Sequence, residues 1–262
     1  MIFRLISFFA LCFSTLLSHA VELDSLHKAT SANIARDLKK YNIPGAAYAI
    51  VKNNKVIAME SFGYTDTSKT QKINHNTVFR LASVSKPFAA TITTMLAQEQ
   101  QLNLSDPVTK YVPNFVLATE GAANKIQLKH LLSHSSGLMP NAYDNLLHEN
   151  WSMDKIISRF DRVTPICQPE KCYGYQNIAY GFLQPAIEAS QPKSYSTLLH
   201  DRIFAPLAMD NASVGIDVFL QQKNTAKPHI LRKRVNTGQK NKAGKDIKRY
   251  VWRTVKVAPD YY

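Results

Sequence analysis

One stretch of this sequence, Phe79 to Leu102, limits what the chain can fold into, because it joins a helical pattern to two reactive side chains. Its apolar residues recur every four positions and predict an amphipathic helix: Val84, Phe88, Ile92 and Leu96, with Met95 beside them. Pro87 lacks the N–H for an early helical bond and disfavours the α conformation at Lys86. We therefore expect a distorted or 3₁₀ first turn.

Ser83 and Lys86 stand at the head of this helix. A hydroxyl and an amine three residues apart lie on one face of a helix, with Cβ atoms about 5–6 Å apart. The helix macrodipole favours a developing anion at Ser83, so the pair is typical of a nucleophile beside its base. The alternative is a surface serine at a helix cap.

The Ser-x-x-Lys pattern has little specificity by itself, because it occurs four times: Ser25 with Lys28, Ser83 with Lys86, Ser152 with Lys155, and Ser190 with Lys193. Only the Ser83 copy opens a long amphipathic helix and follows a short apolar run. That setting is used by serine enzymes that transfer acyl groups.

The N-terminus predicts export. Arg4 precedes an apolar run from Leu5 to Leu17, and small residues follow at the positions that a signal peptidase reads, so residues 1–20 are expected to be a cleaved signal peptide. The run is shorter than the roughly 20 residues that a membrane span needs. Cys12 lacks the small residue before it that a lipoprotein signal requires. We expect a periplasmic or secreted protein with no stable membrane anchor.

Positive charge is concentrated near the C-terminus. The formal net charge is +13, and removing residues 1–20, which contain one basic residue (Arg4) and no acid, leaves +12. Residues 223–256 hold twelve Lys or Arg and one acid, Asp246. A solvated basic loop or hairpin is the simpler interpretation; a surface for an anionic envelope polymer is the alternative. Nucleic acid is not an expected partner, because no aromatic platform or base-reading motif accompanies the charge.

Several further elements follow from local patterns. Residues 24–41 predict a helix that ends near Pro44, and residues 46–62 predict a β-hairpin with turn residues Lys52 to Lys55. A lone hairpin is marginal in water, so we expect partner strands from elsewhere. Helices are expected over four later segments: Gln127–His134, Met153–Phe160, Asn177–Ala189 with an interruption at Pro185, and Tyr195–Phe204. Residues 83–215 are thus expected to be mostly helical.

Two pairs of residues later in the sequence are candidates for a disulfide and for a catalytic role. Cys167 and Cys172 lie five apart with a proline between them, which in an exported chain predicts a small disulfide loop. No second Cys or His pair completes a metal site, so neither a metal nor a cofactor is expected. Tyr175 can act as a base toward a serine when a lysine draws off its proton, and Asn177 can bind a substrate amide.

Tyr175 on its own is more simply a packed aromatic residue, because Tyr-x-Asn also occurs at Tyr143. His134 is a candidate base by type, but a lone histidine at a helix C-terminus is more often structural.

Five segments together resemble the serine β-lactamase and penicillin-binding superfamily, specifically class C β-lactamases and related D-Ala-D-Ala carboxypeptidases and esterases. In order, they are VFRLASVSKPFAA, LNLSDPVTKYVP, IQLKHLLSHSSGL, YQNIAYGFL and RIFAPLAMD. The resemblance implies that Ser83 is acylated, that Lys86 and Tyr175 activate it, and that Asn177 binds the substrate's amide. It implies an α+β fold with a helical domain packed on an antiparallel sheet. The implied substrates are β-lactams, D-Ala-D-Ala peptides of cell-wall type, or esters.

The sequence departs from that family in its third motif, a Lys- or His-Thr/Ser-Gly triplet on a strand. Asn236-Thr237-Gly238 imitates the triplet but has no cation, and it shows no strand pattern. The family's remaining strands and closing helix would follow Tyr262, so residues 21–262 are expected to be a truncated member. The alternative to a hydrolase is an inactive homologue that binds an anionic envelope polymer or has no function.

Overall fold

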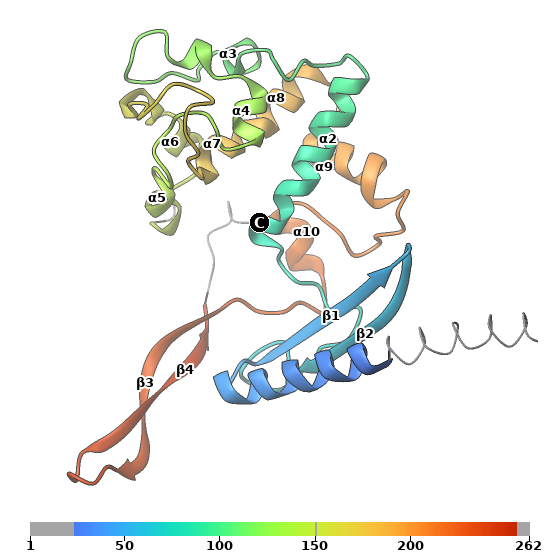
Figure 1. Ribbon diagram of the computed structural model, residues 1–262, viewed down its shortest axis with the longest axis vertical. Coiled ribbons are helices and arrows are strands. Elements are labelled where there is room, and N and C mark those ends of the chain that lie inside the picture. The colour runs from blue at the N-terminus through green and yellow to red at the C-terminus, as the bar shows by residue number, and fades with distance from the viewer. Residues whose placement is uncertain (1–23, 150, 256–262) are drawn as a thin grey trace, which may run out of the picture. The chain divides into compact units, whose positions relative to one another are not determined.

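The computed structural model describes residues 24–149 and 151–255, whose contacts divide the chain into two compact units. Among these residues, the first unit contains 24–79 and 223–255, and the second contains 80–222. Both β-hairpins lie in the first unit, together with the helix over residues 24–41, and the other helices lie in the second (Figure 1). The expected α+β class is confirmed.

The first hairpin pairs β1 (Gly45–Lys52) with β2 (Lys55–Gly63) in antiparallel register. Its turn uses Asn53 and Asn54, with φ of 50° and 59°. Asparagine tolerates this left-handed conformation, and two such residues form the tight turn that matches strand twist. The hairpin expected over residues 46–62 is therefore present.

The helix over residues 24–41 contacts this hairpin through Glu60. Ser31 Oγ donates to Glu60 Oε2 at 2.5 Å, and Tyr48 Oη donates to the same oxygen at 3.2 Å. These hydrogen bonds and the nearby charge of His27 lower the pKa of Glu60, although burial opposes them. The helix ends where Asn42 adopts a φ of 52°.

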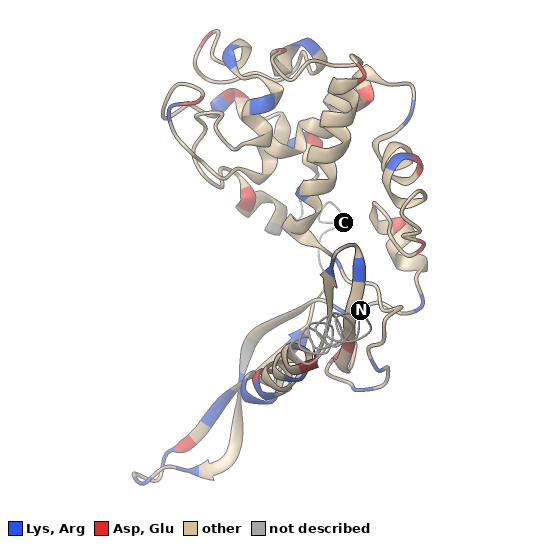
Figure 2. Cartoon of the chain, turned by 45° about the vertical axis from the view of Figure 1, so that its right-hand side comes forward, with Lys and Arg blue, Asp and Glu red and all other residues tan. Residues whose placement is uncertain are grey.

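The second hairpin lies in the Lys- and Arg-rich residues 223–255, called the basic segment below. In it, β3 (His229–Lys240) pairs with β4 (Asp246–Thr254). Lys and Arg positions, blue on the ribbon, occur along this hairpin (Figure 2). Asn236-Thr237-Gly238 lies inside β3, so the absence of a strand there is a wrong prediction. Local pattern failed because the register shifts after Asn236 and Gly238 has a φ of 76°, which interrupts simple alternation.

Backbone hydrogen bonds join the two sequence segments of the first unit. Val78 N donates to Asn224 O at 2.8 Å, and Ala226 N donates to Val78 O at 2.9 Å. Lys227 N also donates to Thr65 O at 2.9 Å. These bonds explain how segments about 150 residues apart in sequence form one unit.

The second unit begins with a 3₁₀ turn, η1 (Ala82–Ser85), that leads directly into α2 (Lys86–Gln98). The irregular first turn expected from Pro87 is present. The predicted apolar stripe is only partly right, since Val84 is 63% exposed. The 3₁₀ turn places Val84 outside the α-helical periodicity, and α2 instead buries four residues: Ala89, Ile92, Thr93 and Leu96.

The remaining helical elements of this unit are short. In chain order they are α3 (Val108–Tyr111), η2 (Ala123–Lys125), α4 (Leu128–Leu132), α5 (Asp144–His148), α6 (Met153–Ile157), η3 (Phe160–Arg162), α7 (Asn177–Gly181), α8 (Leu183–Ser190), α9 (Tyr195–Leu199), the π turn η4 (His200–Phe204) and α10 (Ile216–Gln221).

Some of the expected helices have different bounds. The interruption expected at Pro185 is present but lies after Gly181, because the ring of Pro185 conflicts with a helical carbonyl four residues earlier. The helix expected to reach Phe160 ends at Ile157. The helix expected to reach His134 ends at Leu132, since His134 itself has a φ of 55°.

Three phenylalanines form the centre of this unit's core. Phe160 and Phe182 are fully buried and Phe115 is 1% exposed. The ring of Phe182 lies 4.6 Å from that of Phe115 and 5.3 Å from that of Phe160, centroid to centroid. Phe182 is the residue between α7 and α8, so its burial in the core holds the junction of these two helices in place.

Replacing Phe182 with alanine should reduce the stability of the second unit by about 3–5 kcal/mol, because the vacated space cannot collapse completely. Urea denaturation followed by Trp151 fluorescence, in a Trp252→Phe background, measures this unit alone, since Trp252 belongs to the first unit. Leu207→Ala is the control, with a side chain 67% exposed. A change as small as that of Leu207→Ala would contradict the proposed role of Phe182.

Candidate active site

The four residues predicted to carry chemistry come together within the second unit. Ser83 lies exposed in η1, and its Oγ is 2.7 Å from Tyr175 Oη. The preceding residue, Ala82, has a φ of 48°, a conformation that costs a non-glycine residue about 1–2 kcal/mol. This strained turn presents the hydroxyl of Ser83 ahead of α2.

The ammonium group of Lys86 contacts the other three residues. Its Nζ donates to Asn177 Oδ1 at 2.8 Å and lies 3.5 Å from Ser83 Oγ. It also lies 4.9 Å from the centroid of the Tyr175 ring and 5.3 Å from that of Tyr180. Tyr180 Oη donates to the carbonyl of Lys86 at 2.9 Å, which ties α7 to the start of α2.

Gln176 fixes the turn that carries Tyr175 and Asn177. Its side chain is 1% exposed and caps α7, because Oε1 accepts from the N–H groups of Ile178 and Ala179. Its Nε2 donates to two carbonyls of the loop before α5, Met139 O at 3.3 Å and Ala142 O at 3.2 Å. Sequence reasoning missed this residue, although Gln immediately before a helical pattern offered a weak capping signal.

Opposing effects act on the pKa of Tyr175. Burial raises it, whereas hydrogen bonds with Lys86 and Ser83 and the positive charge of Lys86 lower it. The lowering effects exceed burial and the opposing charge of Asp144, so the pKa lies below its ordinary value of 10.0. A phenol with a lowered pKa, 2.7 Å from a serine hydroxyl, is suited to accept that hydroxyl's proton.

His134 packs against the site. Its ring centroid is 4.4 Å from that of Tyr175, and its Nδ1 accepts from Gln176 N at 3.3 Å. Burial lowers the pKa of His134, and the positive charge of Lys86 lowers it further. A neutral imidazole therefore supports the Tyr175 ring, in keeping with the structural role that its sequence position favoured.

Asp144 is a second site residue that sequence reasoning missed. Its Oδ2 accepts from Asn177 Nδ2 at 2.7 Å. Because Asn177 Oδ1 already accepts from Lys86, both ends of the carboxamide are engaged. In the second Tyr-x-Asn sequence, Tyr143-Asp144-Asn145, it is therefore the aspartate and not the tyrosine that contacts the site.

The Cys167–Cys172 disulfide is formed, with 6.4 Å between the Cα atoms, and it lies just before Tyr175. Within its loop, Glu170 contacts Lys129 Nζ at 2.6 Å and His130 Nε2 at 3.0 Å. Hydrogen bonds from these two side chains lower the pKa of Glu170 to about 2. The loop is thus tied to α4, upstream of the site.

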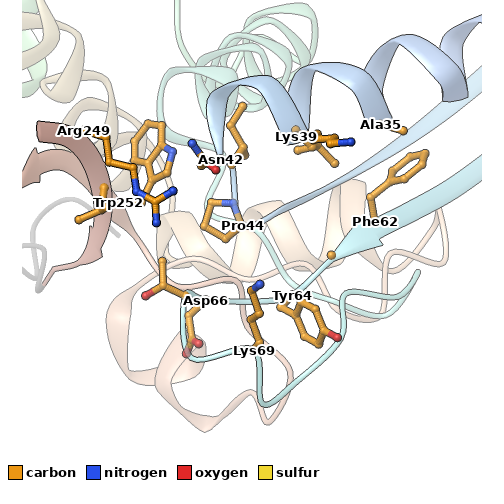
Figure 3. A pocket seen from close by; sticks show the side chains of 15 residues that line it. Ala35, Lys39, Asn42, Pro44, Phe62, Tyr64, Asp66, Lys69, Arg249 and Trp252 are labelled. Carbon is orange, nitrogen blue, oxygen red and sulfur yellow. The ribbon is translucent and has the colours of Figure 1, made fainter. Parts of the chain in front are cut away.

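A separate pocket of about 650 Å³ lies in the first unit (Figure 3). Its wall includes Lys39 from the helix over residues 24–41, Lys69 after β2, and Arg249 from β4. Trp252 of β4 also lines it, and its Nε1 donates to Tyr41 O at 3.0 Å. Part of the basic segment therefore forms a concave, positively charged surface.

The described residues contain neither a candidate metal site nor a membrane-spanning helix. Across 24–149 and 151–255, no three His, Cys, Asp or Glu side chains are grouped so as to hold a metal ion. In that same part of the chain, every helix is too short or too polar to cross a membrane. The expected signal peptide, residues 1–20, lies outside the described residues.

Replacing Lys86 with methionine should raise the pKa of Tyr175, because it removes both a hydrogen-bonding partner and a positive charge while burial and Asp144 remain. ¹³C NMR titration of ζ-labelled tyrosine, assigned with Tyr175→Phe, measures the change. Lys125→Met, in a different part of the same unit, should leave the pKa unchanged. An unchanged Tyr175 pKa in Lys86→Met would show that this lysine does not control the phenol.

Known proteins resemble this chain over most of its length. The family model described as Beta-lactamase matches residues 30–245. Protein flp of Staphylococcus aureus (strain MRSA252) is 32% identical over 196 residues, which cover 74% of this chain and 38% of that protein. Penicillin-binding protein 4* of Bacillus subtilis (strain 168) is 28% identical over 184 residues, covering 67% and 39% respectively.

Solved structures also resemble the chain. The octameric penicillin-binding protein homologue from Pyrococcus abyssi has a TM-score of 0.67 at 26% identity, covering 83% of this chain and 49% of its own. A class C β-lactamase has a TM-score of 0.62 at 22% identity, covering 85% and 57%, and supports the fold alone. The chain spans less than two thirds of each of these relatives. The chain belongs to the β-lactamase family, within the superfamily of serine β-lactamases and penicillin-binding proteins, and has its β-lactamase/transpeptidase-like fold.

Proposed function

We propose that this chain is a serine hydrolase that forms an acyl-enzyme at Ser83. The observation that carries the proposal is the 2.7 Å contact between Ser83 Oγ and Tyr175 Oη, with Lys86 Nζ beside both. Family membership supports the reaction class, because penicillin-binding protein 4* carries the name of an acyl-transferring serine enzyme.

In the proposed reaction, the phenolate of Tyr175 accepts the proton of Ser83 as Oγ attacks a carbonyl carbon. The bond to the leaving nitrogen or oxygen breaks as the tetrahedral intermediate collapses, and Tyr175 returns the proton to that atom. Water then cleaves the acyl-enzyme with the same group acting as base. Lys86 stabilises the phenolate of Tyr175, and Asn177 holds Lys86 in place while its carboxamide lies near an incoming amide.

The proposed substrates are β-lactams, D-Ala-D-Ala peptides of cell-wall type, or esters. Each offers a carbonyl next to a nitrogen or oxygen that leaves with a proton. EstCE1, a hydrolase with promiscuous acyltransferase activity, has a TM-score of 0.70 at 20% identity, covering 87% of this chain and 60% of its own. This similarity is the reason to test an ester beside a penicillin. An exported location, periplasmic or secreted, fits substrates of this kind and is part of the proposal.

A fluorescent penicillin should label the chain covalently, and Ser83→Ala should abolish the labelling. Lys86→Met should slow labelling by about 10²–10⁴-fold, the usual contribution of acid–base assistance. Gel fluorescence over a time course measures both effects. Ser85→Ala is the matched control, because Ser85 is exposed in the same turn and its Oγ donates to Ala82 O at 2.6 Å.

Hydrolysis of p-nitrophenyl butyrate is measured in parallel. Turnover that requires Ser83 without penicillin labelling would assign the site to esters. Folded protein that shows neither reaction would overturn the proposed hydrolase.

A second proposal concerns the pocket of the first unit, and it follows from the three cationic side chains that line it. We infer that this pocket binds an anionic envelope polymer through Lys39, Lys69 and Arg249. Phosphate groups of a polymer would meet the cations, and the 650 Å³ pocket is large enough for one repeating unit and its neighbours to enter. Such binding would be weakened by salt, because exposed charges are screened.

Sedimentation with cell-wall material that carries poly(glycerol phosphate) tests this binding at low and high salt. The triple variant Lys39→Gln, Lys69→Gln and Arg249→Gln should lose most of the salt-sensitive binding. The control variant Lys125→Gln, Lys155→Gln and Lys171→Gln removes the same charge from the second unit and should retain it. Equal losses in both variants would indicate a general charge effect and refute a specific pocket.

A further inference from the structure

Asp144 is the outermost residue of a chain of contacts that ends at the nucleophile. Its Oδ2 accepts from Asn177 Nδ2 at 2.7 Å, and Asn177 Oδ1 accepts from Lys86 Nζ at 2.8 Å. Lys86 Nζ in turn lies 3.5 Å from Ser83 Oγ. Each link joins a donor to an acceptor, so the position of Lys86 depends on how the carboxamide of Asn177 is turned.

An ionised carboxylate can only accept hydrogen bonds, whereas an ammonium group can only donate them. With Asp144 on one side and Lys86 on the other, the carboxamide of Asn177 has one favourable orientation. Turning it over would place its oxygen against a carboxylate and its amino group against an ammonium. The carboxylate therefore selects the orientation in which Oδ1 faces Lys86.

The backbone around Asp144 is held against the segment that carries Asn177. Asp144 is the first residue of α5, directly after Tyr143, whose φ is 65°. The preceding loop is joined to the site because Asn141 N donates to Tyr175 O at 2.8 Å. The two Gln176 Nε2 bonds to the same loop complete the connection. Asp144 thus lies at a fixed place relative to Asn177.

The second carboxylate oxygen of Asp144 supports a functional role. Among the described residues, Asp144 Oδ1 is one of a few buried side-chain atoms without a hydrogen-bond partner. Burying a carboxylate oxygen without a donor is unfavourable for folding. An asparagine or serine could accept from Asn177 at a smaller cost in stability, so the negative charge itself has a use at this position.

The negative charge of Asp144 acts on the pKa of Tyr175, on which charges from two different helices have opposite effects. Lys86 of α2 favours the phenolate and Asp144 of α5 disfavours it. Three further groups face Tyr175: Ser83, whose hydrogen bond lowers its pKa, His134 and Tyr180. Removing the negative charge of Asp144 would therefore lower the pKa of Tyr175 further.

We infer that Asp144 is a positioning residue, which orients the carboxamide of Asn177 so that Oδ1 holds Lys86 Nζ beside Ser83 and Tyr175. The kinetic consequence rests on the proposed acylation of Ser83, whereas the contact itself does not. Asp144→Asn keeps an oxygen that can accept from Asn177 and removes the charge. Asp144→Ala removes both, so the two variants separate orientation from charge.

The kinetic test follows labelling by fluorescent penicillin at several concentrations and pH values. Asp144→Ala should lower the limiting acylation rate by about 10–100-fold, because Lys86 and Tyr175 lose their alignment with Ser83. The penicillin concentration that gives half of this rate should change little. Asp144→Asn should recover most of the rate. In Asp144→Asn the acidic limb of the rate should move to lower pH, because the charge of Asp144 is removed while Lys86 stays in place, so the base Tyr175 loses its proton at lower pH.

Controls separate this result from a purely structural effect. Asp154→Ala, which removes an acid from the first turn of α6, should change neither the rate nor the pH profile. Should Asp144→Ala fail to fold by circular dichroism, the near-isosteric Asp144→Asn still tests the pH shift. An Asp144→Asn variant as slow as Asp144→Ala, or a wild-type rate and pH profile in Asp144→Ala, would overturn the inference.

A measurement without activity distinguishes failure of this inference from failure of the proposed function. ¹³C NMR titration of ζ-labelled tyrosine should show a lower pKa for Tyr175 in Asp144→Asn than in the wild type. If wild-type protein is not acylated but this shift is present, the proposed function fails and the contact stands. An unchanged Tyr175 pKa would overturn the inference whatever the labelling shows.

Discussion

The buried side chain of Gln176 is the constraint on which the site depends. It satisfies two N–H groups at the start of α7 and two carbonyls in the loop before α5, and Gln176 itself is 1% exposed. Leaving such groups unpaired costs about 1–3 kcal/mol each, so the turn has little freedom to rearrange. Tyr175 and Asn177 are the sequence neighbours of Gln176, so holding Gln176 in place also restricts the backbone of both residues.

Local patterns predicted those parts of the fold that depend on neighbouring residues. The 3₁₀ turn before α2 follows from Pro87, and the first hairpin follows from its Asn53-Asn54 turn. The exposure of Val84 was mispredicted, because a shifted helical phase is not visible in hydrophobic spacing. The helix interruption expected from Pro185 is present, but it falls four residues earlier, after Gly181. Element boundaries needed backbone geometry that apolar periodicity does not contain.

The candidate site was predicted through residue types but not through its supports. Ser83, Lys86, Tyr175 and Asn177 were named from two short motifs and a family resemblance, and the structure places them in contact. Asp144 was missed because its contact with Asn177 spans 33 residues of sequence and no spacing rule connects them. His134 was expected to be more often structural than catalytic, and only the fold shows that its ring packs against Tyr175.

The opposing charges around Tyr175 explain why a tyrosine rather than a more acidic group can serve this site. Burial and the carboxylate of Asp144 raise the pKa of Tyr175, whereas the hydrogen bonds with Lys86 and Ser83 and the charge of Lys86 lower it. A group balanced in this way changes its protonation state when a neighbour moves or loses its proton, which is what transfer to and from Ser83 requires. All of these groups belong to residues 80–222, so the ionisation of the base is decided within the second unit.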